Sequence, residues 1–462
     1  MRYVLLSVLV WLITLLAMTA PAAAQSRHPI IVLTDIGADP DDEQAMTRLL
    51  HYANDFDIRG LIATRAVKSG VSTVRKDKIL AIINAYEIDL PYLSQHDSRF
   101  PSAAQLRGAT KAGSTSGTVG AHTEGSLHIF NVVQAAANAG SAPVWVLVWG
   151  GPRELAQALA QARSTLSADG YVRFKQKLRV YSIAHQYEPA VGERIIRENP
   201  DLFYIVAGPP GITDSMRHLF RGMYKTLDER TYLNESWIRT NLWSGHGALA
   251  RQYPGNVNLG GYRVNAVKEG DTPSFLHLMP IGLNDPQQPE QGGWGGRFYR
   301  TLDRTSGLTF WNDISVADTV WYSTANVMDR RIAVARWRQQ FQQDFAARAD
   351  WAVRSYADAN HAPVAAINGP AALTVRSGST LTLDASGSTD PDGDALSYKW
   401  WIYNEVGTYP GAVSIANSRS RVASLVAPRV SAPATLHVIL EAQDGGSPRL
   451  TRYRRVVITV VP

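Results

Sequence analysis

Four aspartates follow a short apolar segment near the start of the chain and are candidates for binding a metal ion. Residues 30–33 read Ile-Ile-Val-Leu, and Asp35, Asp39, Asp41 and Asp42 come shortly afterwards. Carboxylates this crowded repel one another, so they persist only with a countercharge or with shifted pKa values. Ca²⁺ is a suitable countercharge, because it takes several carboxylate and carbonyl oxygens in flexible geometry. An acid-rich helix cap is the simpler alternative, but a cap needs only one or two acids.

The surrounding pattern places these aspartates on a turn between a strand and a helix. Residues 30–33 are typical of a buried strand in a parallel sheet. Gly37 and Pro40 interrupt the regular backbone, and the apolar residues between 45 and 50 recur at helical spacing. Open α/β sheets bind their ligands beyond the carboxyl ends of the strands. The sequence therefore predicts a ligand site at this turn.

The segment 35–42, Asp-Ile-Gly-Ala-Asp-Pro-Asp-Asp, resembles the N-terminal aspartate signature of nucleoside hydrolases, Asp-x-Asp-Pro-Gly-x-Asp-Asp. This resemblance implies that Asp42 is a Ca²⁺ ligand and that Asp41 binds sugar hydroxyls. More narrowly, the whole chain resembles the nucleoside hydrolase-like "cellulose-binding" proteins of polysaccharide-degrading bacteria, a family named from binding.

The signature is broken at Gly37. There the family has the acid that both binds calcium and activates water. Asp35 or Asp39 would have to take that role here, so both are expected as metal ligands, with Asp35 as the first candidate for the catalytic base.

Alternating strand and helix patterns extend from residue 30 to about 300 and predict a doubly wound, mostly parallel sheet. This is the α/β fold that the nucleoside hydrolase resemblance also implies. A helix is expected over 75–86, and further strands are expected over 58–64, 144–149, 179–184 and 203–206.

Two later loops resemble further parts of the nucleoside hydrolase calcium site. The turn that starts Gly150-Gly151-Pro152 resembles one from which a backbone carbonyl reaches the metal, and the resemblance places that carbonyl at or next to Arg153. Asp271 resembles the late aspartate that completes the calcium shell. An ordinary strand–turn–helix joint and a helix cap are the respective alternatives.

Four residues are candidates for protonating a leaving group or binding sugar hydroxyls: His122, Glu124, His185 and His246. A histidine with a pKa near neutrality suits proton donation. Gln186 follows His185 at a strand end and is a candidate for substrate binding. A helix cap for Glu124 and structural roles for the histidines are the alternatives, and the sequence does not choose among the donors.

A glycine-rich loop at 292–298 carries Trp294 and Arg297. Trp294 is expected to stack on a sugar ring, and Arg297 to pair with a carboxylate or phosphate. The alternative is a loop whose tryptophan covers the edge of the core.

The N-terminus resembles a secretory signal. An apolar run reaches residue 16, and the Ala22-Ala23-Ala24 end predicts a signal peptide over 1–24. No other run is long enough for a membrane span. Cysteine is absent, so stability must come from packing or metal. We expect a periplasmic or secreted bacterial protein that has no membrane partner after cleavage.

The mature chain is expected to divide into a nucleoside hydrolase-like domain (25–328), a long helix and linker (329–362) and a small all-β sandwich (363–462). The helix is expected from Asp329 to Asp358, with Trp337, Phe341 and Phe345 packed on the first domain.

The C-terminal part carries a segment, beginning at Leu381, that resembles PKD and related Ig-like modules. Its alternating Asp390, Asp392 and Asp394 lack a closing glutamate, so a turn held by Asx-type bonds is expected rather than a calcium loop. The tryptophans at 400–401 are expected to point to opposite faces of a strand, the outward one as a carbohydrate platform.

Together these features predict an exported Ca²⁺-dependent hydrolase that acts on glycosyl bonds of a carbohydrate or glycoside. Asp35 or Asp39 would deprotonate a metal-bound water, and carboxylates including Asp41 would stabilise an oxocarbenium-like transition state. The alternatives are a non-catalytic carbohydrate (cellulose)-binding protein and an exported nucleoside N-ribohydrolase. The net charge of +6 forms no long basic run, so a nucleic acid polymer is not an expected partner.

Overall fold

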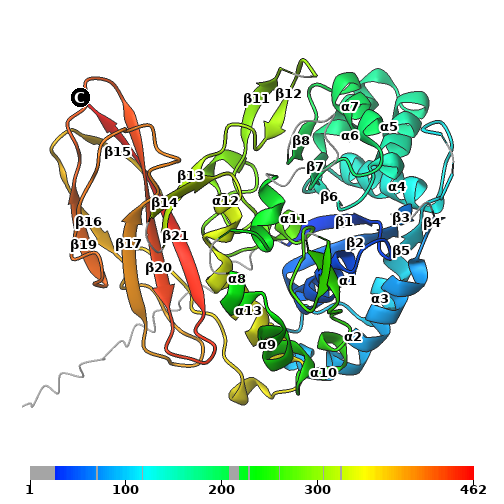
Figure 1. Cartoon of the computed structure of the whole chain (residues 1–462). Helices are drawn as coiled ribbons and strands as arrows, with labels where there is room; N and C mark the ends of the chain where they lie inside the picture. The colour runs from blue at the N-terminus through cyan, green and yellow to red at the C-terminus, as the bar shows by residue number, and fades with distance from the viewer. Residues whose placement is uncertain are drawn as a thin grey trace, which may run out of the picture.

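The N-terminal part of the protein is an α/β domain, and the C-terminal part is a β domain packed against it (Figure 1). The predicted signal peptide lies outside the described residues. Among the described residues, no helix has the length and apolar character needed to cross a bilayer. The computed structural model describes residues 27–68, 71–116, 118–207, 218–226, 229–259, 261–304, 306–322 and 325–462.

An eight-stranded sheet forms the centre of the α/β domain, in the order β11-β12-β8-β7-β6-β1-β2-β5. Neighbouring strands are parallel except for the antiparallel β11–β12 pair. The predicted mostly parallel sheet is therefore confirmed. The strands are β1 (His28–Thr34), β2 (Phe56–Ala63), β5 (Thr110–Ala112), β6 (Val144–Val148), β7 (Leu178–Ser182), β8 (Phe203–Val206), β11 (Tyr299–Asp303) and β12 (Leu308–Asn312).

Helices cover both faces of this sheet, because side chains alternate along each strand. Ile30 and Val32 of β1 pack in one apolar cluster with α1 and α2, whereas Ile31 and Leu33 pack in another with α4 and α5. All four side chains are fully buried. The helices are α1 (Asp41–His51), α2 (Lys76–His96), α3 (Ala103–Ala109), α4 (Glu124–Ala139), α5 (Arg153–Thr165), α6 (Ala168–Gln176) and α7 (Pro189–Glu198).

Short elements join the longer helices and strands, and the later ones, such as β13 and β14, lead from the sheet towards the β domain (Figure 1). They include the hairpins β3–β4, β9–β10 and β13–β14. Their bounds are η1 (Ala53–Asp55), β3 (Ala66–Lys68), β4 (Val71–Thr73), η2 (Leu219–Met223), α8 (Glu229–Tyr232), α9 (Glu235–Ile238), η3 (Arg239–Trp243), α10 (Gly247–Ala250), β9 (Val257–Leu259), β10 (Tyr262–Val264), α11 (Pro273–Leu276), η4 (Pro289–Gln291), β13 (Asp318–Tyr322) and β14 (Ala325–Asp329).

The prediction of one long helix over 329–358 is wrong. The chain instead forms α12 (Ile332–Ala335), α13 (Arg338–Trp351) and η5 (Tyr356–Asp358). Trp337 interrupts the helix with φ −100° and ψ 3°, and its ring packs edge-on against Tyr403 and Tyr453 of the β domain. Docking of the two domains therefore decides the backbone here. Phe341 and Phe345 are buried in the α/β core as expected.

The β domain consists of two packed sheets, β15-β21-β20-β17 and β16-β19-β18. The expected Asx-type turn is confirmed, because the Asp390 carboxylate accepts the N–H groups of Asp392 and Asp394 at 2.9 and 3.1 Å. The strands are β15 (Ala372–Arg376), β16 (Thr380–Asp384), β17 (Ser397–Ile402), β18 (Ile415–Ala416), β19 (Val422–Val426), β20 (Ala434–Gln443) and β21 (Thr451–Val461).

The two tryptophans of β17 do point to opposite sides. Trp400 lies in the core between the two sheets. Trp401 faces the α/β domain, where its ring lies 6.0 Å from that of Trp337 and its indole N–H donates to Glu441. The outward tryptophan, Trp401, therefore packs at the contact between the two domains, and most of its ring is not available to bind a carbohydrate.

A buried ion network ties the two domains together. Asp318 is fully buried and accepts hydrogen bonds from Arg297 at 2.5 and 2.9 Å, from Arg336 at 3.1 Å and from the Tyr403 hydroxyl at 2.7 Å. Two guanidinium groups and one phenol thus supply the hydrogen bonds of a carboxylate that is buried away from water. A buried charge network of this kind is costly to break, because removing one partner leaves the others without compensation.

We expect Asp318→Ala to lower the free energy of unfolding by about 3–5 kcal/mol, because Arg297 would be left buried without its partner. Urea-induced unfolding measures the change. Glu193→Ala, which removes a solvent-exposed ion pair with Arg197, is the control and should change stability little. Equal losses in the two variants would contradict the role given to Asp318.

Candidate metal centre and active site

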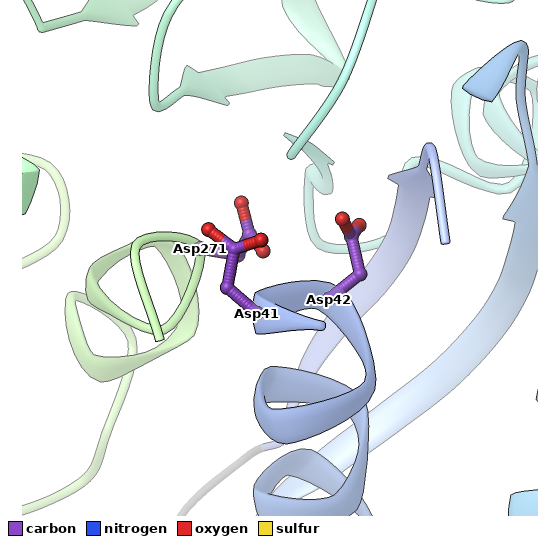
Figure 2. Close-up of side chains that lie close together, drawn as sticks. All are labelled: Asp41, Asp42 and Asp271. Carbon is purple, nitrogen blue, oxygen red and sulfur yellow. The ribbon is translucent and has the colours of Figure 1, made fainter. Parts of the chain in front are cut away.

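Three aspartates from distant parts of the sequence converge beyond the carboxyl end of β1. Asp41 and Asp42 open α1, where the helix dipole favours negative charge, and Asp271 comes from the loop before α11. One carboxylate oxygen from each lies within 4.8 Å of the others. Figure 2 shows the three side chains pointing into the space between α1 and the later loop.

Asp35 and Asp39 complete the group but differ in their surroundings. Asp35 directly follows β1 and is buried, with its carboxylate against Gly150. A Cβ at Gly150 would lie 2.5 Å from Asp35 Oδ1, so glycine is required there. Asp39 lies at the rim, where it pairs with Lys268, and the same ammonium lies 3.6 Å from Asp41. We call these five aspartates the acid cluster.

Two polar side chains of α1 hold the loop that carries Asp271. Gln44 Oε1 accepts the backbone N–H groups of Lys268 and Glu269 at 2.7 and 3.2 Å. One helical turn further on, Arg48 forms a fully buried ion pair with Glu269 at 2.7 Å. The helix that supplies two members of the acid cluster thus also positions a third.

Burial and mutual repulsion raise the pKa values of the clustered carboxyl groups. Burial is the largest cause for each, followed for Asp35 by the charge of Asp41, and the Asp35 pKa is about 7. The Asp41 pKa is raised to about 6 by burial, although Lys268 opposes the shift. The pKa values of Asp42 and Asp271 are raised well above their usual range by burial and by neighbouring aspartates.

The same groups fit a hard divalent cation. Asp271 Oδ2 is buried and has no hydrogen-bond partner among the described residues. Asp42 accepts one hydrogen bond, from the Thr34 hydroxyl at 2.5 Å. An all-carboxylate set with an unpartnered oxygen is the kind of site that Ca²⁺ or Mg²⁺ occupies, and a cation would remove the repulsion that raises these pKa values.

Gly37, where the aspartate signature is broken, is required by the local backbone. Its φ of 100° disfavours residues with a side chain, and a Cβ there would lie 2.9 Å from Arg75 Cγ. An aspartate at this position does not fit the turn as it is folded here. The departure from the signature is therefore a structural feature of this chain.

Arg153 is the first residue of α5, and its guanidinium pairs with Glu188 and donates to the Ser114 carbonyl at 3.2 Å. A backbone carbonyl at the start of a helix normally accepts a bond from four residues further on. The turn before Arg153 does reach the acid cluster, through Gly150. A carbonyl ligand at or next to Arg153 stays a prediction.

Glu124 and His122 lie at the start of α4, and both are exposed. The Glu124 carboxylate lies 3.3 Å from Lys76 and 3.8 Å from Lys111, and it accepts the Ala112 N–H at 2.9 Å. Although burial opposes the shift, these partners lower the Glu124 pKa. An ionised carboxylate suits binding sugar hydroxyls better than donating a proton.

His185 and Gln186 follow β7 at the same edge of the sheet as the acid cluster. His185 is buried, with Nε2 3.0 Å from the Tyr204 hydroxyl. The Gln186 amide donates to the Trp149 carbonyl at 3.1 Å and so ties the β7 loop to the β6 turn. Both contacts position the loop between the ends of β6 and β7.

The structure does not bring His246 to the acid cluster. Its ring lies 3.1 Å from Asp350 and 2.8 Å from the Thr240 carbonyl. His246 lies close enough to His51 for its charge to affect that ring. His51 is the last residue of α1, whereas Asp41 is the first. A helix of this length separates its two ends by about 15 Å, so His246 is not placed to protonate a leaving group there.

Trp294 and Arg297, expected on a flexible substrate loop, are buried at the contact with the β domain. Trp294 is fully buried and packs edge-to-face against Phe341 and Tyr453. Arg297 pairs with Asp318. The expectation of an exposed stacking face is therefore wrong, because domain docking covers the loop.

Several residues at the site were not expected from the sequence: Thr34, Gln44, Arg48, Lys268 and Tyr187. For α1, the available signal was two polar residues, Gln44 and Arg48, four positions apart among apolar residues of the expected helix. Both side chains are fully buried in the structure. Lys268 lies three residues before the expected Asp271. The sequence does not show which residues these side chains contact, because their partners lie more than two hundred residues away in the chain.

A doubly wound parallel sheet with an aspartate cluster beyond its first strand defines a nucleoside hydrolase-like α/β protein. Residues 29–298 match the family described as "Cellulose-binding Sde182, nucleoside hydrolase-like domain". Residues 380–460 match "Cellulose-binding protein Sde0182, C-terminal domain". The chain therefore belongs to the nucleoside hydrolase-like cellulose-binding family, and both the expected family and the expected fold are confirmed. The finer PKD or Ig-like assignment of the β domain stays a prediction.

A solved structure supports this assignment over nearly the whole chain. It is a nucleoside hydrolase-related hypothetical protein from Saccharophagus degradans, described as associated with carbohydrate metabolism. The two sequences are 34% identical, the match covers 94% of this chain and 100% of the other, and the TM-score is 0.76. No curated protein matches the chain.

We expect Asp271→Asn to weaken Ca²⁺ binding at least about tenfold, because ligand charge sets the affinity of such sites. The metal-free variant should be more stable than the metal-free wild type, since one repelling charge is removed. Calorimetric titration and thermal unfolding measure the two effects. Asp201→Asn, at an exposed aspartate paired with Lys175, is the control, and equal Ca²⁺ affinity in both variants would count against the site.

The effect of Ca²⁺ on stability should depend on pH. A carboxyl group whose pKa is raised in the folded protein destabilises the fold when it ionises, so stability from this source falls as the pH rises. With pKa values of about 7 for Asp35 and about 6 for Asp41, the melting temperature gained on adding Ca²⁺ should increase from about pH 5 to about pH 8. Thermal melts with and without Ca²⁺ measure this gain, and a gain that does not vary with pH would contradict the prediction.

Proposed function

We propose that this protein is an exported, Ca²⁺-dependent hydrolase of glycosyl bonds that acts on a carbohydrate or glycoside. The observation that carries the proposal is the convergence of Asp41 and Asp42 with the distant Asp271 beside the buried Asp35. The family's cellulose-binding name supports a carbohydrate partner. Export rests on the signal-like sequence of residues 1–24.

Asp35, Asp42 and Asp271 are the residues best placed to hold the cation. Each is buried, and their charges act on one another. Bound Ca²⁺ would offset their repulsion and lower the pKa of a water molecule, although less than Zn²⁺ does. Asp39 is the weaker candidate, because Lys268 already pairs with it at the rim.

Asp35 is the best candidate for the base that takes a proton from the attacking water. Its carboxylate is held in place between the end of β1 and Gly150, and it lies in the interior of the acid cluster. A fixed, desolvated carboxylate beside the metal suits general-base catalysis, because bound Ca²⁺ would keep it ionised and ready to accept a proton.

Asp41 is less buried than Asp35, Asp42 and Asp271, and its contact with Lys268 places it beside the rim of the site. It is therefore suited to accept hydrogen bonds from sugar hydroxyls. Carboxylates on this side would also stabilise the positive charge that develops at the anomeric carbon during glycosyl-bond cleavage.

A non-catalytic carbohydrate-binding protein is the second candidate. The family is named from cellulose binding, and Gly37 stands where nucleoside hydrolases have the acid that activates water. Both points favour binding without turnover. The retained Asp41, Asp42 and Asp271 favour the hydrolase, and release of ribose from inosine or uridine would instead indicate an exported nucleoside hydrolase.

The test is sugar release from a panel of aryl glycosides, oligosaccharides and nucleosides with Ca²⁺ present. Asp35→Asn should lower kcat about 10²- to 10⁴-fold, the usual contribution of a general base, and should retain measurable Ca²⁺ binding. Asp42→Ala should lose both Ca²⁺ binding and activity. Binding of oligosaccharides without turnover by the wild type would leave the carbohydrate-binding alternative.

A further inference from the structure

Tyr187 has an unusual backbone conformation in the loop after β7. Its φ is 59°, a left-handed value that is costly for a bulky residue. The Glu188 N–H donates to the Gln186 carbonyl at 2.7 Å, which closes a three-residue turn centred on Tyr187. Turns of this kind with a positive φ at the central residue are rare and strained. Strain of this kind persists only where the surrounding structure enforces it.

Both neighbours of Tyr187 are fixed by contacts of their own. Gln186 donates to the Trp149 carbonyl. On the other side, Glu188 is buried in its ion pair with Arg153 and packs against Gly151. The turn is therefore held rigidly between the ends of β6 and β7.

The strained residue itself is exposed, and its loop lies beside the acid cluster: Gln186 donates to the carbonyl of Trp149, and the next residue, Gly150, packs against Asp35. The Tyr187 side chain belongs to the large exposed side chains of the protein, at 43% exposure. Burial, and after it the charges of Asp35, Asp42, Asp41 and Asp39, raise the pKa of the Tyr187 phenol. A tyrosine phenol is protonated at neutral pH, so it can donate a hydrogen bond.

We propose that Tyr187 is a substrate-contacting residue whose ring forms a wall of the site above the acid cluster and stacks on the C–H face of a sugar. An aromatic ring with a polar tip is suited to such a contact, because it offers an apolar face and a hydrogen-bond donor together. The hydroxyl donates to an oxygen of the sugar or of its leaving group. This inference rests on the proposed carbohydrate substrate and names a residue that the sequence did not single out.

Tyr187→Gly separates fold from function. Glycine adopts a positive φ without cost, so the variant should unfold at the same temperature or about 1–2 °C higher than the wild type. Its affinity for the best-bound glycoside of the panel should fall at least about tenfold, and Ca²⁺ affinity should change less than about twofold. Tyr187→Phe, which retains the ring, should keep most of the affinity and lose only the contribution of the hydroxyl.

Tyr356→Gly is the matched control. Tyr356 has the same exposure, 43%, but no positive φ, and it lies beside the opposite edge of the sheet, in a cavity of about 630 Å³ that also contains His28 at the start of β1. Glycine there should lower the melting temperature and leave glycoside affinity unchanged.

The outcomes distinguish this inference from the proposed function. Loss of glycoside affinity in Tyr187→Gly alone supports the role of Tyr187, whether or not the wild type turns the ligand over. Unchanged affinity and turnover in Tyr187→Gly would overturn that role and leave the hydrolase proposal standing. A wild type that binds Ca²⁺ but no glycoside, oligosaccharide or nucleoside of the panel would overturn both.

Discussion

Repulsion among the buried carboxylates at the end of β1 is the main physical constraint on the α/β domain, because the surrounding contacts must hold these groups together. Asp35 and Asp42 follow the central strand, and Asp271 is brought to them from the far end of the domain. Bringing them together without a cation costs free energy, as their raised pKa values show. The buried contacts of Gln44 and Arg48 with the later loop offset that cost and fix the geometry. Such preorganised charge is what a metal site, and a site that stabilises a cationic transition state, requires.

The β domain packs directly against the α/β domain and shares its apolar core. Trp294, Trp337 and Tyr453 belong to the α/β core cluster, and Asp318 is satisfied by side chains from both domains. Packing of this kind covers the aromatic residues that could otherwise bind a sugar chain. The carbohydrate recognition proposed above therefore involves the strand-end loops around the acid cluster, where Tyr187 is exposed.

Two residues near the acid cluster have backbone conformations that their neighbours enforce. Gly37 has a positive φ and packs against Arg75, and it stands where nucleoside hydrolases have an acid. Tyr187 has a positive φ although its side chain disfavours it. At Gly37 the positive φ costs little free energy, because glycine has no side chain. At Tyr187 the same backbone conformation lowers stability, and the aromatic ring is nevertheless retained. Such a cost is most easily understood if the ring has a function.

The sequence by itself determined the local features: the strand at 30–33, the helix after it, the aspartate signature and the alternation that produces a parallel sheet. These depend on neighbours in the chain and on side-chain periodicity, so a single sequence contains them. Even the buried faces of α13 were predictable from Phe341 and Phe345. The family resemblance added Asp271, which no local pattern connects to Asp42.

The tertiary structure alone decided which candidates meet. It brought Lys268 to Asp39, Gly150 to Asp35 and Tyr187 to the acid cluster, and it placed His246 at the other end of α1. It also buried Trp294 and Arg297 and broke the expected helix at Trp337, because the β domain docks there. Contacts across two hundred residues depend on how whole elements pack, and residue type and spacing along the chain do not contain that information.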